Sequence, residues 1–226
     1  MFRILIATAT LLEINILHEY LKKNWISQQP FVFQKGNVEV NVLVTGVGLP
    51  MMAYSLGKFF SIKPVHFAIN AGIGGAIDRQ LSLGDVVQVI SERFADLGAE
   101  QKDGSFEDLH EMGLIAADAP PFEKGRMWNE QAGTFAFLPT AHGLSVNKVH
   151  GHELSIARMV QKYPDAGVES MEGAAFFYAA LIEKTPFLEI RAISNYVEPR
   201  NRESWDIPLA VNRLNETLVA ILDSFL

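Results

Sequence analysis

Apolar residues recur along this chain at two spacings, and the change from one to the other predicts strands separated by helices. A short apolar run near the start is followed by Thr10 and then by leucine and isoleucine at helical spacing, which is typical of a strand leading into a capped helix. We expect strands over 2–7, 31–35, 38–45, 66–70, 86–91, 136–138, 143–146 and 187–194. We expect helices after Thr10, over 50–60, over 153–162, after Gly173 and over 209–225.

This order of elements indicates an α/β protein. Strands that alternate with helices form a central mixed or mostly parallel sheet covered on both faces. The segment 95–133 breaks the pattern, because glycine, proline and acidic residues are scattered among single apolar residues. We interpret it as a long loop or irregular insertion, where a lid or a subunit contact could lie.

Composition narrows the class of protein. The 226 residues are 49% hydrophobic, enough for a core of their own, and they include no cysteine, so disulfides and thiolate sites are excluded. A net charge of −7 without a run of basic residues argues against a nucleic acid as the binding partner. Charged residues interrupt the apolar stretches, so that none is long enough to cross a membrane. We interpret the first apolar run as a strand, not a targeting peptide, and expect a cytoplasmic protein with a small-molecule partner.

Several polar or glycine-rich positions fall at predicted strand ends or helix starts: Glu13, the segment 70–75, Glu172 and Asn195. Ligands of such sheets bind beyond the strand ends, so these positions are expected to converge. Each also has a structural explanation. The glycines would make a tight turn, Glu172 would complement a helix dipole, and Asn195 would simply favour a turn.

Two segments carry a family resemblance: Val-Glu-Ser-Met-Glu-Gly-Ala-Ala at 168–175 and Arg-Ala-Ile-Ser-Asn at 191–195. Together they resemble the purine nucleoside phosphorylase and nucleosidase superfamily. With Pro-Arg-Asn-Arg at 199–202 and Trp205, they resemble the futalosine hydrolases, which serve an alternative menaquinone pathway. The resemblance implies one domain over residues 1–226, a three-layer αβα sandwich with a mixed, partly barrel-like sheet. It also implies hydrolysis of futalosine to hypoxanthine and dehypoxanthine futalosine, without a cofactor.

The resemblance assigns roles that glycoside cleavage needs. Glu172 would accept hydrogen bonds from the ribose hydroxyls, and Met171 would pack under the sugar. Glu13 would orient and deprotonate the attacking water, which Arg191 would help to organise. Glu13 as a solvent-facing helix residue and Arg191 in a structural ion pair remain alternatives. The remaining substrate-binding positions are Gly72, Ile73, Val149, His150 and Ser194, of which Val149 and His150 would form the wall around the base.

Two departures from relatives bear on the reaction. Asn195 stands where adenine-cleaving relatives have an aspartate that protonates N7. An amide supplies no such proton but can donate to the O6 of hypoxanthine. Ile73 stands where phosphorylases place a phosphate-binding serine, which favours water as the nucleophile.

The 5′ side of futalosine carries an aromatic ketone and a carboxylate. Arg200, Arg202, Lys148 or a histidine would bind the carboxylate, and residues 94–106 would close the apolar side. A neighbouring subunit contributes there in related enzymes, so we expect a homodimer or higher homo-oligomer. The six histidines show no metal-ligand spacing, so we expect no metal site.

Other functions stay open from the sequence. The main alternative is a methylthioadenosine/adenosylhomocysteine nucleosidase, which Asn195 disfavours, or a purine nucleoside phosphorylase, which Ile73 disfavours. A nucleoside-binding protein without catalysis is a third, which the presence of Glu13 disfavours because binding alone needs no water-activating carboxylate.

Overall fold

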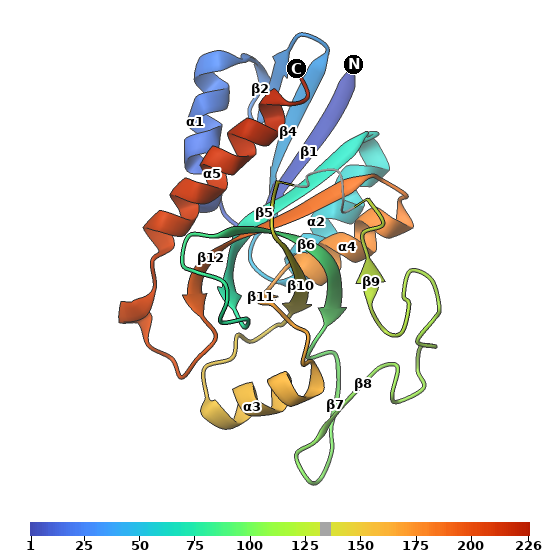
Figure 1. Cartoon of the computed structure of the whole chain (residues 1–226). Coiled ribbons are helices and arrows are strands. Elements are labelled where there is room, and N and C mark those ends of the chain that lie inside the picture. Colours follow the sequence, from blue (N-terminus) through green and yellow to red (C-terminus); the bar gives the residue numbers. More distant parts are fainter. Residues whose placement is uncertain (132–136) are drawn as a thin grey trace.

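The computed structural model describes residues 1–131 and 137–226 and shows a central mixed sheet between helices (Figure 1). The strands are β1 (Phe2–Thr8), β2 (Ile26–Gln29), β3 (Val32–Lys35), β4 (Val38–Val44), β5 (Phe67–Ala76), β6 (Val86–Phe94), β7 (Gly98–Glu100), β8 (Phe106–Asp108), β9 (Met127–Trp128), β10 (Thr140–Ser145), β11 (Val168–Ser170) and β12 (Phe187–Tyr196). The helices are α1 (Asn15–Asn24), α2 (Leu49–Ile62), α3 (Glu153–Lys162), α4 (Gly173–Ile182) and α5 (Ile207–Asp223), with short 3₁₀ helices η1 (Leu11–Ile14) and η2 (Arg202–Ser204).

The main sheet closes partly on itself. Its order is β11-β10-β6-β12-β5-β1-β4-β3-β2, and β11 also pairs with β5, which joins five of these strands into a barrel-like ring. The sheet contains parallel pairs such as β1–β5 and β5–β12 and antiparallel pairs such as β6–β12. The α/β class with a mixed, partly closed sheet is therefore confirmed. In the described part of the chain, no helix is long and apolar enough to span a membrane.

Side chains of β1 explain why helices cover both faces. Ile4 and Ile6 point into a core cluster shared with α1 and α5, whereas Leu5 and Ala7 point into a second cluster shared with α2 and α4. Successive side chains of a strand point to opposite faces, and all four are fully buried because both faces of this central strand are covered. Figure 1 shows α1 and α5 on one side of the sheet and α2 and α4 on the other.

Several predicted elements need correction. Ala136 lies outside the described residues, and Phe137 and Leu138 are not in a strand, since β10 begins at Thr140. The segment 95–133 is largely irregular within the described residues, as predicted, but it contains the small hairpin β7–β8 and the short strand β9. The edge strand β2 and the ring-closing strand β11 were not predicted, because β2 is exposed throughout and β11 spans three residues.

The glycine-rich segment is not a turn before a helix. Strand β5 continues through it to Ala76 and pairs with β12 along this length. A methyl group at Gly74 would come within 2.7 Å of Cγ1 of Val168, so glycine is needed here for close packing and not for a bend. Likewise, Asn195 lies inside β12 and not after it.

Candidate active site

Glu13 is held by donors from β1, from β5 and from Thr10, which precedes η1. Its Oε2 accepts hydrogen bonds from the Thr10 N–H at 2.9 Å, the Thr10 hydroxyl at 3.1 Å and the Thr8 hydroxyl at 3.2 Å. Its Oε1 accepts from the Ile73 N–H at 3.2 Å. The Thr10-x-x-Glu13 pattern is that of a capping box at a helix start. Glu13 therefore turns toward β5, contrary to the alternative of a solvent-facing helix residue.

Glu172 precedes α4 and is almost fully buried. Its Oε1 accepts from the Gly48 N–H at 2.8 Å, and Gly48 has a φ of +102°, which side chains of other residues disfavour. Burial raises the pKa of Glu172, although Arg191 and the Gly48 N–H oppose the rise, and the charge of Glu13 adds to it. The two carboxylates therefore act on each other within one site.

Arg191 lies in the interior of β12, not at a strand end, and only 1% of it is exposed. Its Nη2 is 3.2 Å from Oε1 of Glu189, and its Nη1 donates to the Ile190 carbonyl at 3.0 Å. A methyl group at Gly72 would lie 3.0 Å from Oε1 of Glu13 and 3.6 Å from Nη1 of Arg191. The alternative of a structural ion pair is thus real, but the same guanidinium also approaches Glu13 across Gly72.

Asn195 and Ser194 form a second group farther along the same strands. The Ser194 hydroxyl donates to Oδ1 of Asn195 at 2.9 Å and lies 3.3 Å from the Gly74 carbonyl. Nδ2 of Asn195 donates to the Tyr196 carbonyl at 3.0 Å and is 3.0 Å from where a methyl at Gly75 would lie. One amide hydrogen of the half-buried Asn195 remains for another acceptor.

The other predicted binding residues border this region. Met171 is half-buried immediately before Glu172, and Val149 packs at the edge of a core cluster. His150 is tied to Glu169 of β11 by its backbone N–H at 3.0 Å and by its Nδ1. Glu169 thus anchors the predicted pocket wall to the strand that leads into Glu172.

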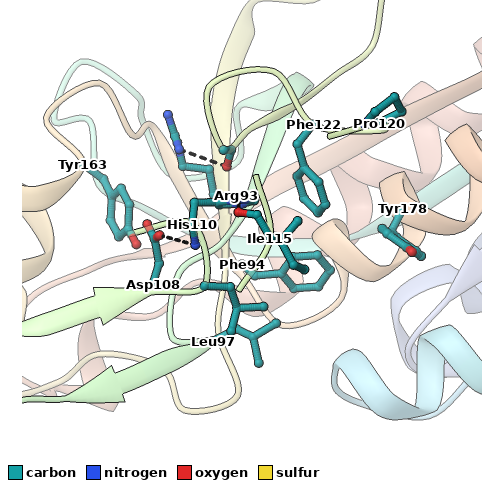
Figure 2. Close-up of a pocket in the computed structure, with 12 residues that line it drawn as sticks. Arg93, Phe94, Leu97, Asp108, His110, Ile115, Pro120, Phe122, Tyr163 and Tyr178 are labelled. Carbon is teal, nitrogen blue, oxygen red and sulfur yellow. Dashed lines mark hydrogen bonds between the residues drawn. The ribbon is translucent and has the colours of Figure 1, made fainter. Parts of the chain in front are cut away.

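Two cavities lie in the described part of the chain, and none of the predicted site residues lines either of them. One has a volume of about 320 Å³, and Figure 2 shows the rings of Phe94, Phe122 and Tyr178 toward one end of it and Tyr163 toward the other. The other measures about 490 Å³ and is lined mainly by apolar residues of α2 and α4. It includes Leu49, which follows the Gly48 that binds Glu172. Phe94 and Leu97, from the segment 94–106 that is predicted to close the apolar side of the pocket, line both cavities.

Sequence reasoning missed Gly48, Glu169 and Glu189. Glu189 had a usable signal, because it lies two residues before Arg191 in a strand and so shares its face. The sequence indicated for Gly48 only that a glycine there favours a turn between a strand and a helix. Within the described residues, no group of three or more histidine, aspartate or glutamate side chains could hold a metal ion.

Comparison with known proteins identifies the family of this chain. Residues 3–226 match the family model described as the phosphorylase superfamily. The chain belongs to this superfamily. Superfamily relatives include the futalosine hydrolase of Acidothermus cellulolyticus, which is 32% identical over 186 residues, covering 80% of this chain and 74% of the relative.

Another branch of the superfamily is also similar. The 5′-methylthioadenosine/S-adenosylhomocysteine nucleosidase of Glaesserella parasuis is 25% identical over 84% of this chain and 83% of its own. The solved nucleosidase of Neisseria meningitidis, in complex with methylthio-immucillin-A, has a TM-score of 0.79 at 18% identity, covering 99% of this chain and 100% of that one. At 18% identity, this structural similarity shows that the two chains share a fold.

Proposed function

We propose that this protein hydrolyses the N-glycosidic bond of futalosine and releases hypoxanthine and dehypoxanthine futalosine. The observation that carries the proposal is the approach of Glu13 and Arg191 to each other across Gly72, with Glu172 close enough for its charge to interact with both. Nucleosidase chemistry is common to both groups of similar proteins. The segment 199–202 and Trp205, which follow the superfamily segments 168–175 and 191–195, favour the futalosine branch.

The chemistry requires groups of different charge. Water attacks C1′ of the ribose while the purine leaves, and positive charge develops on the sugar in the transition state. Glu172 would bind the ribose hydroxyls and place negative charge beside this cation. Glu13, already oriented by four donors, would accept the proton of the attacking water. Arg191 would help to hold that water.

Water is favoured over phosphate as the nucleophile. The side chain of Ile73 packs against the core cluster beneath α1 and α5, and its backbone N–H is bound by Glu13. The position therefore offers no hydroxyl to a phosphate ion. A neighbouring carboxylate would also repel a phosphate dianion.

Asn195 supports a 6-oxopurine as the leaving base. Its Oδ1 accepts from Ser194, which leaves Nδ2 as the group that would meet the base. An amide N–H donates to the O6 of hypoxanthine, whereas the exocyclic amine of adenine needs an acceptor at this place.

Replacing Asn195 by aspartate tests the base assignment. Asn195→Asp is expected to lower kcat/KM for futalosine and to raise it for 5′-methylthioadenosine, each by about 10- to 100-fold, because one mismatched buried hydrogen bond costs roughly 1–3 kcal/mol. Chromatography would follow the release of hypoxanthine and of adenine by the wild type and by Asn195→Asp. Asn201→Asp is the matched control, since either side chain caps η2 in an exposed position. Equal losses on both substrates would contradict a base-reading role.

The cavity of about 490 Å³ suits the 5′ side of futalosine. Its walls are apolar, as an aromatic ketone requires, and it begins beside Gly48 and Glu172. Among the proposed carboxylate partners, Arg200 is exposed and stacks on the ring of Trp205 at 5.3 Å. Its donors are accessible to a ligand carboxylate, but Arg200 does not line this cavity.

We also propose that two copies associate through α2 and α4. These helices pack against each other and expose the large apolar side chains of Met51, Tyr54, Tyr178 and Ile182, which a second copy would cover. The same helices line the larger cavity, so a second copy would complete its wall.

Breaking this surface should produce monomers. The double variant Tyr54→Glu/Ile182→Glu is expected to sediment as a monomer and to bind nucleoside at least 10-fold more weakly, because its cavity would open to water. Leu154→Glu, on an exposed position of α3, is the control and should leave the assembly unchanged. A wild-type protein that sediments as a monomer at micromolar concentration would contradict the proposal.

A further inference from the structure

Behind the candidate site lies a fully buried pair of carboxyl groups, Glu92 of β6 and Glu189 of β12. A methyl group on Gly173, the first residue of α4, would collide with Oε1 of both side chains. The two oxygens therefore converge on one point. Neither receives a hydrogen bond from any other group of the described chain.

Two ionised carboxylates would repel each other strongly in this environment. Burying one unpaired charge is already unfavourable, and a second like charge adds to the cost. One proton between the two Oε1 atoms removes the repulsion and supplies the missing donor. Burial raises the pKa of Glu92, and the charge of Glu189 raises it further, although Arg191 opposes both effects.

The surroundings distinguish the two partners. Oε1 of Glu189 is 3.2 Å from the Arg191 guanidinium, and its Oε2 accepts from Asn70 at 3.4 Å. Within the described residues, the carboxyl of Glu92 accepts a hydrogen bond from the Ser145 hydroxyl, at 3.0 Å on its Oε2, and pairs with no cation. The carboxyl beside the cation keeps its charge, so Glu92 is the one that holds the proton.

We propose that Glu92 and Glu189 share one proton, carried by Glu92, and that Glu189 is a positioning residue that holds Arg191 against the Gly72 side of the site. The positioning role rests on the proposed nucleosidase function, whereas the shared proton does not. Arg191 is the cation that acts on Glu92, Glu189 and Glu172 alike. Neutralising Glu92 leaves one full charge to pair with Arg191 and keeps Glu172 available to the substrate.

Isosteric substitutions separate the two carboxyls. In Glu92→Gln the amide replaces a neutral carboxyl and still donates to Glu189, so kcat should stay within about threefold of wild type. In Glu189→Gln the charge beside Arg191 is lost, so kcat should fall by about 100-fold with little change in KM. Any nucleoside that the wild type hydrolyses serves as the substrate, and Glu39→Gln, at an ion pair with Arg3 and Lys63, is the control.

Infrared difference spectra test the proton without any substrate. The wild type should show the carbonyl band of a protonated buried carboxyl, and Glu92→Gln should lose it. If Glu189→Gln does not fold, Glu189→Asp keeps the charge but withdraws it by one methylene, and its kcat should fall about 10-fold while the protein stays folded by circular dichroism.

Two results would overturn the inference: a wild-type spectrum whose acid band survives Glu92→Gln, or equal losses of kcat in Glu92→Gln and the Glu189 variants. A wild type without nucleosidase activity would reject the proposed function and, with it, the positioning role. The infrared result would still decide the shared proton.

Discussion

Glu13→Gln is expected to lower kcat by about 10³-fold while leaving the Kd for a bound nucleoside nearly unchanged. A positioned general base contributes roughly 10²–10⁴-fold to the rate, and an amide cannot accept the proton of the attacking water. Gln can still accept a hydrogen bond from Ile73 or Thr10, so the loop should keep its conformation. Single-turnover rates and equilibrium binding would be measured on the same preparation.

Glu39→Gln is the matched control for this substitution. Glu39 pairs with Arg3 at the far end of β1 from Thr8 and Glu13, so its loss should not alter kcat. If Glu13→Gln retains more than a tenth of the wild-type turnover, the protein does not use this carboxylate as its base. A nucleoside-binding function without catalysis would then gain support.

Glu172→Gln is the second substitution with a large expected effect. Removing the negative charge beside the developing sugar cation should lower kcat/KM by about 10²–10³-fold, because charge stabilisation in a water-poor site is lost. The affinity for the substrate should fall less than kcat/KM, since the amide oxygen of glutamine still accepts a hydrogen bond from one ribose hydroxyl. Steady-state kinetics with wild type and variant at several pH values would measure both effects.

The same substitution should make the protein more stable at neutral pH. Burial raises the pKa of Glu172 in the folded state above its ordinary value. The folded protein then binds more protons than the unfolded chain between these two pKa values, so stability falls as pH rises through that window. Glutamine removes this cost, and Tm measured at pH 7 should rise. A lower Tm with unchanged kinetics would contradict both the electrostatic account and the assigned role.

The amphipathic patterns predicted the layers of the fold well. Leu214 and Leu218 recur at helical spacing in α5 and are buried as expected, and the continuous apolar run 4–7 of β1 reflects a strand with a core on each face. These signals are local, since each depends on the burial of a single element. The path of β5 was less predictable, because glycine ordinarily weakens strands. Gly74 is needed within the strand because Val168, distant in sequence, packs where a side chain at this position would lie.

The candidate site likewise contains residues that a local sequence pattern predicted and contacts that no local pattern predicted. Glu13 and Glu172 were found because each precedes or begins a helix after a strand, within segments that resemble the superfamily. The contact between Gly48 and Glu172 joins positions 124 residues apart, and no local pattern encodes it. The pairing of Glu92 with Glu189 was likewise invisible, because a single glutamate in a strand gives no sign of which residue it will face.

The most direct test of the proposed reaction is a phosphate-free incubation of the purified protein with futalosine, inosine and 5′-methylthioadenosine in parallel. Chromatography would follow the released bases. We predict that hypoxanthine is released from futalosine at a rate at least 100-fold above release from the other two substrates. Adenine release from 5′-methylthioadenosine at a comparable or higher rate, or release of base only when phosphate is added, would contradict the futalosine hydrolase assignment.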